Sequence, residues 1–319
     1  MRWPTPEMAD LVITEFMDEE AVTGLAADFD LLYDPTLVDR RDELLSCVED
    51  ARGVIIRNRT KIDAEFIAAA PSLLVVGRLG VGLDNIDLAA CDRRHVAVHP
   101  ATGANAAAVA EYVIGAILVL VRGVYGATDR MTAGEWPRTA LAGGEIAGRR
   151  LGLVGFGGIA RLVAEKAAAL GMVVAAHDPL VAGDDPTWEA VERRATLDDL
   201  LVGSDAISLH VPLLDTTRNM LDAAAIALLP AGAIVVNTAR GGVVDETALI
   251  QALRNGALGG AALDVFATEP MDARGGARFA GVPNLLLTPH IAGITEESNR
   301  RVSALVAARV RRALEAAAP

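Results

Sequence analysis

Short, continuous apolar runs recur along the chain, and stretches with helical periodicity separate them. Most of these runs consist of Val, Leu, Ile and Ala without the polar alternation of a half-buried strand. They are therefore typical of parallel strands that are buried on both faces. The pattern predicts an α/β fold. The predicted strands are Leu11–Phe16, Leu31–Tyr33, Val54–Ile56, Leu73–Val76, Val96–Val98, Leu151–Val154, Val173–Ala176, Ala206–His210, Ile234–Val236, Ala261–Val265 and Leu285–Leu287.

The order of these runs predicts two doubly wound parallel-sheet domains. The first five strands precede a long apolar helix, predicted from Ala104 to Arg122, and the other six follow it. A chain of 319 residues is also long enough for about two domains of roughly 150 residues each. In open parallel sheets, ligands bind beyond the carboxyl ends of the strands. Residues that directly follow each apolar run are therefore the first candidates for a functional site. The segment 272–283 is predicted to be a loop.

Charge and composition argue against several classes of partner. The formal net charge is -13 and the pI is about 4.9, which disfavours binding to nucleic acid or to an acidic membrane surface. The longest apolar stretch, beginning at Ala106, is interrupted by Glu111 and predicts a buried helix rather than a membrane span. The N-terminus lacks the pattern of a signal peptide. Cys47 and Cys91 are isolated, without metal-ligand spacing, so we expect a cytoplasmic protein with no metal site.

A glycine-rich turn follows the strand Leu151–Val154. Gly155, Gly157 and Ala160 form a G-x-G-x-x-A pattern that opens a helix-like stretch. The first glycine permits a tight turn, the second lets a pyrophosphate approach the backbone, and a small third residue allows close helix packing. The helix N-terminus also offers free N–H groups to phosphates. Asp178 ends the next strand, where a carboxylate accepts both ribose hydroxyls and repels a 2′-phosphate. The combination predicts NAD rather than NADP.

Three residues whose side chains can bind anions or transfer protons stand after later strands of the same half. Arg240, Glu269 and His290 each have an ordinary interpretation alone: a surface arginine, a loop glutamate and a capping histidine. Together they suit hydride transfer between nicotinamide and a 2-hydroxy acid. The arginine would hold the substrate carboxylate and carbonyl. The histidine would take the hydroxyl proton, and the glutamate would orient the histidine and stabilise its imidazolium form.

Two further arginines stand at strand ends in the N-terminal half. Arg57 opens the stretch "RNRT" after Val54–Ile56, and Arg78 follows Leu73–Val76. If these parallel strands are neighbours, their ends lie about 5 Å apart. Both guanidinium groups would then reach one point, with the Thr60 hydroxyl beside them. A second anionic group on the substrate, a phosphate or a sulfonate, would explain the pair. The alternative is that Arg57, Arg78 and Arg59 are solvated or salt-bridged, and Arg59 is the one most expected to point away.

The motifs taken together resemble the D-2-hydroxyacid dehydrogenase family, and more narrowly its phosphoglycerate dehydrogenase branch. The resemblance rests on "VVGRLGVGLDNID", "AEYVIGAILVLVRG", "GFGGIA", "HVPLLDTTRNM", "VNTARGGVVDETALIQAL", "AALDVFATEP" and "LTPHIAG". It implies a Rossmann NAD-binding domain at 102–289 and a flavodoxin-like, discontinuous substrate domain at 1–101 and 290–319. It also implies a homodimer, because the long apolar helix is similar to the element that crosses to a second subunit.

The resemblance also implies roles for individual residues. Arg240, Glu269 and His290 would be catalytic, and Gly80 and Val81 would donate backbone N–H groups to the substrate carboxylate. Thr238 and Asp264 would lie on the nicotinamide side of the cofactor. The full set of implied cofactor contacts is Gly155, Gly157, Gly158, Ile159, Asp178, His210, Val211, Pro212, Thr217, Thr238, Asp264 and Gly293.

The substrate stays open at this point. Phosphoglycerate dehydrogenases have arginines at the positions of Arg57 and Arg78, whereas "RNRT", "GRLGVG" and "PHIAGIT" are also similar to sulfolactate dehydrogenases. We therefore expect 3-phosphoglycerate or sulfolactate, then hydroxypyruvate or glyoxylate. A non-catalytic, NAD-sensing binding protein similar to a corepressor is the alternative from another class. One departure from the family stands at Gly158, where relatives often have an arginine near the pyrophosphate.

Overall fold

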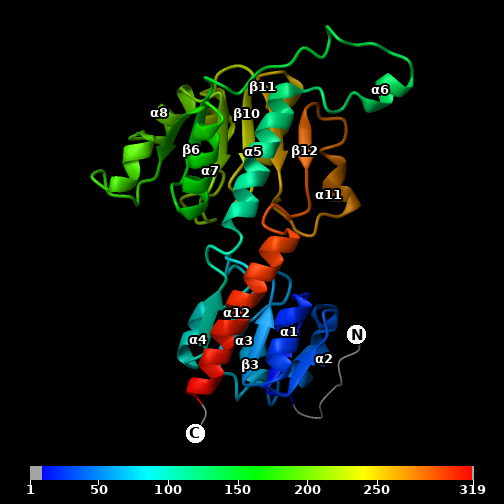
Figure 1. Ribbon diagram of the computed structural model, residues 1–319, viewed down its shortest axis with the longest axis vertical. Helices are drawn as coiled ribbons and strands as arrows, with labels where there is room; N and C mark the ends of the chain where they lie inside the picture. The colour runs from blue at the N-terminus through cyan, green and yellow to red at the C-terminus, as the bar shows by residue number, and fades with distance from the viewer. Residues whose placement is uncertain (1–8, 318–319) are drawn as a thin grey trace. The chain divides into compact units, whose positions relative to one another are not determined.

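The computed structural model describes residues 9–317, which divide into two compact units (Figure 1). One unit comprises residues 9–105 and 294–317, and the other comprises residues 106–293. Each unit is built on a parallel sheet covered by helices on both faces. The predicted fold class, two parallel-sheet α/β domains, is confirmed. The chain passes between units after residues 105 and 293, whereas the sequence placed the domain boundaries after residues 101 and 289.

The first unit contains a five-stranded sheet in the order β2-β1-β3-β4-β5. All neighbouring strands in it are parallel, and the order reverses between β1 and β3, as in doubly wound folds of the flavodoxin type. The segments 14–16 and 57–60, which follow these two strands, therefore lie at the switch point where ligands bind in such sheets. The strands are β1 (Leu11–Ile13), β2 (Leu31–Tyr33), β3 (Gly53–Ile56), β4 (Val75–Arg78) and β5 (Ala97–Pro100).

Successive residues of these strands face opposite sides of the sheet, so each face has its own core. One face packs against α1 and the C-terminal helix α12, and the other packs against α2, α3 and α4. The contact with α12 is close, since a Cβ placed on Gly77 of β4 would lie 2.6 Å from Val306 and 2.7 Å from Val310. The helices are α1 (Glu19–Ala26), α2 (Arg41–Cys47), α3 (Ala64–Ala69), α4 (Leu88–Arg93) and α12 (Glu296–Ala316), with a 3-10 turn at Leu37–Asp39.

The second unit contains a seven-stranded sheet in the order β12-β11-β10-β9-β6-β7-β8. Its order reverses between β6 and β9, which is the Rossmann arrangement. The two-residue strand β8 was not predicted, because both of its residues are polar and exposed. The strands are β6 (Arg150–Val154), β7 (Val173–His177), β8 (Glu192–Arg193), β9 (Ala206–Leu209), β10 (Ala233–Asn237), β11 (Leu258–Leu263) and β12 (Leu285–Leu287).

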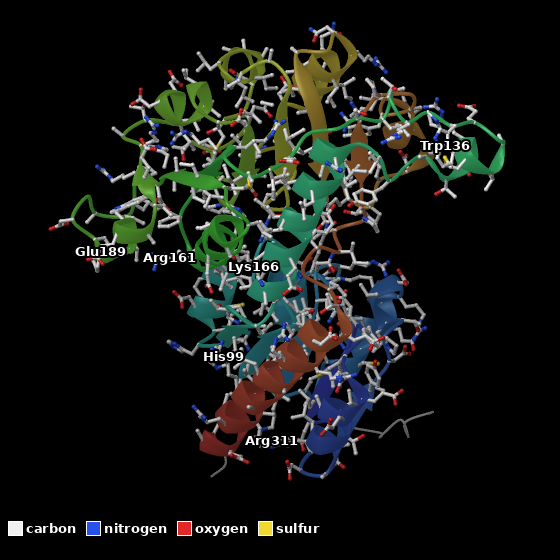
Figure 2. All side chains as sticks on the ribbon, turned by 45° about the horizontal axis from the view of Figure 1, so that its top comes forward. His99, Trp136, Arg161, Lys166, Glu189 and Arg311 are labelled. Carbon is white, nitrogen blue, oxygen red and sulfur yellow. The ribbon has the colours of Figure 1, made fainter. Side chains whose placement is uncertain are left out.

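Helices α5 and α7 cover one face of the second sheet, and α8, α9 and α10 cover the other. The segment around α6 extends away from the rest of this unit, and Trp136 in it is 78% exposed (Figures 1 and 2). Among residues 9–317, no helix is long and apolar enough to cross a membrane. The helices are α5 (Ala106–Arg122), α6 (Thr128–Thr132), α7 (Gly158–Ala169), α8 (Leu197–Val202), α9 (Ala223–Ala227), α10 (Glu246–Arg254) and α11 (Ala273–Ala277), with a 3-10 turn at Pro186–Ala190.

The segment predicted as a loop at 272–283 contains the short helix α11, so that prediction was wrong in part. Asp272 begins the helix, and its carboxylate accepts the Gly275 N–H at 2.7 Å. This cap compensates for two glycines that are unfavourable inside a helix.

Candidate functional site

The glycine-rich turn lies between β6 and α7, at the reversal point of the second sheet. Gly155 has a positive φ of 86°, and a Cβ there would lie 2.7 Å from the carbonyl oxygen of His210. A side chain at this position would therefore be strained and would clash with the segment that follows β9. Nothing lies within 4 Å of a Cβ placed on Gly157 or Gly158, so the backbone is open to an approaching group. Such an opening at a helix N-terminus fits a pyrophosphate.

Three buried polar atoms without partners lie in or directly after strands β9 and β10, in the described part of the chain. They are Nε2 of His210, Oγ1 of Thr238 and Oγ of Ser208. Unsatisfied buried polar groups are costly in a folded protein, so their presence at strand ends points to a bound molecule that completes them. Burial lowers the pKa of His210 to about 4. His210 is therefore neutral near pH 7 and retains one ring nitrogen as an acceptor.

The carboxylate of Asp178 closes the same turn. Its Oδ2 accepts the N–H of Phe156 at 2.8 Å, and its Oδ1 accepts the N–H of Leu180 at 2.9 Å. A carboxylate has about four acceptor positions, so two remain for ribose hydroxyls. The Phe156 ring stacks on Trp188 with centroids 5.0 Å apart. Arg161, labelled in Figure 2, donates from Nε to the Phe156 carbonyl at 3.0 Å. These contacts fix the shape of the turn.

The remaining predicted cofactor contacts lie around the turn with mixed exposure. Ile159 is in the first turn of α7, and Val211 packs against the core beneath β9. The hydroxyl of Thr217 donates to the Pro212 carbonyl at 2.6 Å and accepts the Leu214 N–H at 2.8 Å, so it closes a local loop. Gly293 ends the segment of the second unit.

His290 and Glu269 form a direct pair. His290 Nδ1 lies 2.7 Å from Glu269 Oε2, while Glu269 Oε1 accepts the Phe266 N–H at 2.8 Å. Burial raises the pKa of Glu269, but its hydrogen bonds to His290 and Phe266 and the charge of Arg240 outweigh burial and lower the pKa overall. The glutamate therefore stays ionised and fixes the histidine ring, with Nε2 left to face a substrate.

The backbone of His290 is held in an unusual conformation. Its φ is 55°, a value that is uncommon for residues other than glycine. The N–H of His290 donates to the Asp264 carbonyl at 2.8 Å, and this contact ties the conformation to the end of β11. Strained residues held by their surroundings concentrate at functional sites.

The side chain of Asp264, predicted to lie on the nicotinamide side of the cofactor, is buried beneath the loop of His290. It is 1% exposed, and both of its oxygens are occupied by the segment that carries His290. Oδ1 accepts the Thr288 hydroxyl at 2.6 Å and the Ile291 N–H at 2.8 Å, and Oδ2 accepts the Ala292 N–H at 2.8 Å. These three donors use three of the about four acceptor positions of the carboxylate. Asp264 therefore holds the loop around His290, and Tyr112 extends the network through a 2.6 Å contact with Thr288. The contact of Asp264 with the nicotinamide side stays a prediction.

Arg240 lies in the loop after β10. Asn237 at the strand end shapes this loop, since its amide donates to the Arg240 carbonyl at 3.0 Å and accepts the Ala239 N–H at 3.0 Å. The Arg240 guanidinium donates to the Ala239 carbonyl at 2.6 Å, and its charge acts on Glu269. The second unit therefore brings the three predicted catalytic residues, Arg240, Glu269 and His290, to one edge of its sheet.

In the first unit, the half-buried Arg57 lies at the switch point. Its Nη2 donates to Oδ1 of Asn299 on α12, and its guanidinium lies 5.6 Å from the centroid of the Phe16 ring. Nε of Arg57 is buried and has no hydrogen-bond partner among the described residues. Burial lowers the pKa of Arg57, and the charge of Glu15 opposes that effect. Unused donors on a fixed guanidinium suit an oxyanion ligand.

Arg78 ends β4, the neighbour of β3, and its Nη1 donates to the Leu79 carbonyl at 3.1 Å. The guanidinium folds against Gly80, where a Cβ would lie only 1.5 Å from Nη1. The N–H of Gly80 donates to the Arg78 carbonyl at 2.8 Å, so it is not available for the predicted carboxylate contact. Val81 is 36% exposed and is the remaining candidate for that contact.

Thr60 and Arg59 of "RNRT" take different positions. Thr60 is 2% exposed, and its hydroxyl lies 2.8 Å from that of Thr14 beneath the loop. The predicted substrate contact of this hydroxyl is therefore not supported, because the hydroxyl faces the core. Arg59 forms an ion pair with Asp39 on the surface, which accounts for its charge without a ligand.

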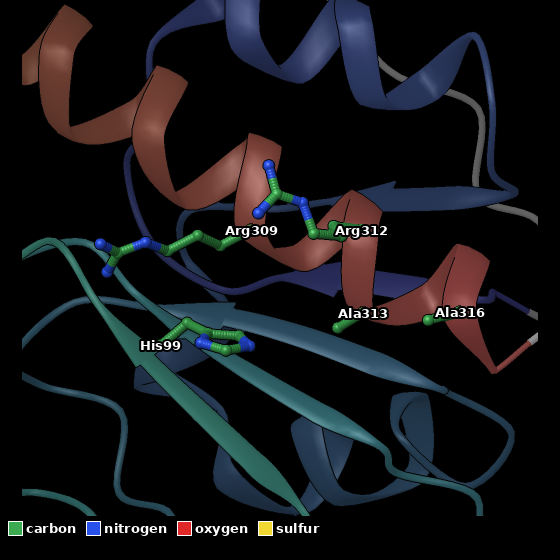
Figure 3. Close-up of a pocket in the computed structure, with 5 residues that line it drawn as sticks. All are labelled: His99, Arg309, Arg312, Ala313 and Ala316. Atoms are coloured by element: carbon green, nitrogen blue, oxygen red, sulfur yellow. The ribbon is translucent and has the colours of Figure 1, made fainter.

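Figure 3 shows a separate pocket in the first unit, between β5 and α12. His99 from β5 and Arg309 and Arg312 from α12 line it. None of the predicted site residues is among the residues that line this pocket. Within residues 9–317, no group of three or more His, Cys, Asp or Glu side chains is arranged to hold a metal ion.

A family model described as the NAD-binding domain of D-isomer specific 2-hydroxyacid dehydrogenases matches residues 114–292. The chain belongs to this family. The match lies within the second unit and contains the glycine-rich turn, Arg240, Glu269 and His290. The predictions of the family, of NAD as cofactor and of an NAD-dependent 2-hydroxyacid dehydrogenase are thereby confirmed.

The dehydrogenase is similar to three individual proteins over most of its length. It is 54% identical over 307 residues to (S)-sulfolactate dehydrogenase of Chromohalobacter salexigens, a match that covers 96% of this chain and 99% of the relative. It is 40% identical over 274 residues to D-3-phosphoglycerate dehydrogenase of Mycobacterium tuberculosis, which covers 86% of this chain and 51% of that protein. The crystal structure of the TT0316 protein from Thermus thermophilus superposes with a TM-score of 0.87 at 32% identity, covering 96% and 97% of the two chains.

Proposed function

We propose that this dehydrogenase oxidises a 2-hydroxy acid with a second anionic group, and that the group is a sulfonate, as in sulfolactate. The contact that carries the proposal is the 2.7 Å pair of His290 Nδ1 and Glu269 Oε2, with Arg240 acting on the same glutamate. This arrangement supplies a proton acceptor and an anion-binding guanidinium, which are the two groups that oxidation of a 2-hydroxy acid needs.

The roles of the catalytic residues follow from this geometry. Arg240 binds the substrate carboxylate and positions the C2 hydroxyl. Nε2 of His290 takes the hydroxyl proton as the C2 hydrogen leaves with its electron pair, and Glu269 stabilises the imidazolium that forms. When bound, NAD supplies the acceptor for that hydride. Gly157, Gly158 and the N-terminus of α7 would hold its pyrophosphate, and the carboxylate of Asp178 would hold the adenosine ribose.

The second anionic group is assigned to Arg57 and Arg78. These arginines stand at the carboxyl ends of the paired strands β3 and β4. Arg57 is accompanied by the buried carboxylate of Glu15, which reduces the net positive charge near it. A lower net charge suits a sulfonate, with one negative charge, better than a phosphate monoester, with nearly two. The 54% identity to a sulfolactate dehydrogenase supports the same choice.

The stereochemical labels of the family and of this relative agree. D-lactate is the (R) isomer because its carboxylate outranks the methyl group. In sulfolactate the sulfur-bearing carbon outranks the carboxylate, so the same spatial arrangement is labelled (S). A D-isomer specific enzyme would therefore act on (S)-sulfolactate.

We also propose that the enzyme is a cytoplasmic homodimer with no nucleic-acid or membrane partner. Exposed apolar side chains on and after α5 support a second copy of the chain as partner: Leu118 is 38% exposed, Tyr125 66% and Trp136 78%. Solitary large apolar residues are common on surfaces, but a group of this kind along one segment is typical of an interface. Sedimentation in solution tests the dimer.

Steady-state formation of NADH with NAD and a panel of hydroxy acids tests the proposed function. The panel contains both enantiomers of sulfolactate, 3-phosphoglycerate, D-lactate and D-glycerate. We expect the highest kcat/KM with (S)-sulfolactate and loss of turnover with every substrate in His290→Ala. A preference for 3-phosphoglycerate would contradict the sulfonate assignment. Binding of NAD without turnover of any hydroxy acid would contradict the enzyme itself.

A further inference from the structure

The backbone of the loop 57–60 is held by two polar side chains, Glu15 and Asn85, to which the sequence analysis gave no role. On one side, Glu15 accepts three N–H groups: Arg57 at 2.8 Å, Thr60 at 3.0 Å and Arg59 at 3.3 Å. On the other side, the amide of Asn85 donates to the carbonyls of Arg57 at 2.9 Å and Thr60 at 2.6 Å. All five contacts reach the backbone of one short loop, so they fix its conformation.

The negative charge of Glu15 is stabilised by the N–H groups of this loop. The residue is 5% exposed and forms no ion pair within the described residues. A buried carboxylate is costly unless several hydrogen bonds satisfy it, even where a charge such as that of Arg57 acts on it from nearby. Here the three N–H groups of the loop supply them. The carboxylate and the loop conformation therefore depend on each other.

The five contacts of Glu15 and Asn85 with the loop backbone, called the clamp below, also help to position the guanidinium of Arg57. Its Cα is fixed by the Glu15 and Asn85 contacts, and its far end is fixed by Asn299 and by the Phe16 ring. A free arginine side chain carries about 2 kcal/mol of rotamer entropy. Holding it in place before binding removes that cost from the binding step. The buried Nε without a partner then remains as a donor that a ligand can complete.

We propose that Glu15 is a positioning residue for recognition of the substrate's distal oxyanion, acting through the backbone of Arg57 with Asn85 as its counterpart. The proposal rests on the proposed function, in which Arg57 binds that oxyanion. It adds that specificity depends on a buried acid that does not touch the substrate. By charge alone, an acid next to an anion site weakens anion binding, so removing Glu15 should strengthen it. The positioning role predicts the opposite, that removing Glu15 weakens anion binding.

The test compares Glu15→Gln and Glu15→Ala with the wild-type enzyme on (S)-sulfolactate and D-lactate. Glutamine keeps one acceptor oxygen but places an NH2 group against the loop, so it weakens the clamp while removing the negative charge. We expect kcat/KM for sulfolactate to fall about tenfold in Glu15→Gln and further in Glu15→Ala, with less than about a twofold change for lactate. The fall in kcat/KM should come from a higher KM for sulfolactate. The affinity for NAD, measured by calorimetry, should not change. Glu20→Gln, at an exposed position of α1, is the matched control.

Two outcomes would overturn the proposal. One is tighter sulfolactate binding in Glu15→Gln, as charge removal alone predicts, and the other is equal loss on both substrates. A crystal structure of Glu15→Gln provides a measurement independent of turnover. The Arg57 guanidinium should leave Asn299 and Phe16 in that structure, and an unmoved guanidinium would refute the positioning role. A wild-type enzyme without preference for sulfolactate over lactate would instead count against the proposed function, so the two failures are distinguishable.

Discussion

Replacement of Gly80 by alanine tests whether Arg78 acts at the substrate site. A Cβ at position 80 would lie 1.5 Å from Nη1 of Arg78 and 2.7 Å from its Cζ. Ordinary contact between such atoms lies at about 3.5–4.0 Å, so the guanidinium must move by about 2 Å to reach it. This movement breaks the 3.1 Å contact of Nη1 with the Leu79 carbonyl and displaces the charge from the end of β4.

The size of the effect follows from the interaction that is lost. A hydrogen bond to a charged group contributes about 1.5–3 kcal/mol, which corresponds to about 10- to 100-fold in kcat/KM. We therefore expect Gly80→Ala to lose that factor with (S)-sulfolactate and much less with D-lactate, which has no distal anion. Initial rates of NADH formation with both substrates measure the effect. Thermal unfolding reports separately on backbone strain, since the φ of 155° at Gly80 does not suit alanine.

The double variant Gly80→Ala with Arg78→Ala separates the two causes. If Gly80→Ala acts by moving Arg78, the double variant loses no more sulfolactate activity than Arg78→Ala alone. Additive losses would refute this reasoning and place the effect in the loop backbone. A Gly80→Ala enzyme with unchanged discrimination between sulfolactate and lactate would refute a role for Arg78 in the distal site.

Two further predictions concern the second unit. Glu269→Gln should lower kcat about 10- to 100-fold for all hydroxy acids with little change in NAD affinity, because the imidazolium of His290 loses a charge-assisted hydrogen bond. Stopped-flow single turnover measures the rate of hydride transfer. An unchanged rate would contradict a catalytic role of the pair of His290 and Glu269. His210 is neutral in the folded state because its pKa of about 4 lies below the unfolded value of about 6.5, so protonation of the unfolded chain destabilises the protein as pH falls from about 6.5 to 4. Between pH 7.5 and 5.0 this should account for about 2 kcal/mol of unfolding free energy in urea titrations. His210→Gln should remove that part of the pH dependence, and an identical pH dependence would show that His210 is not its source.

The parts of the molecule that the sequence predicted are those with local signals. Strands β6 and β10 are continuous apolar runs, and Gly155 and Asp178 stand at fixed distances from such runs. The rule that ligands bind at the carboxyl ends of parallel strands then selects Arg57 and His290 without knowledge of contacts. Where the signal was weak, as for the polar, exposed strand β8, the prediction failed.

The direction of polar side chains could not be predicted, because it depends on contacts between distant segments. The three hydrogen bonds from residues 288–292 to the Asp264 carboxylate, for example, have no signal in the sequence. Asn299 holds a guanidinium 242 residues earlier in the chain. Glu15 had a usable signal, since it follows β1 at the switch point of the first sheet and is an acid at the end of an apolar run.

We propose that Arg57 and Arg78 give this dehydrogenase its preference for a hydroxy acid with a distal sulfonate. The most direct measurement is the ratio of kcat/KM for (S)-sulfolactate to that for D-lactate, in the wild-type enzyme and in Arg57→Ala. We predict a ratio well above one for the wild type that falls by about 10-fold or more in the variant, through KM for sulfolactate. An equal loss on both substrates, or a ratio that the variant leaves unchanged, would contradict the account.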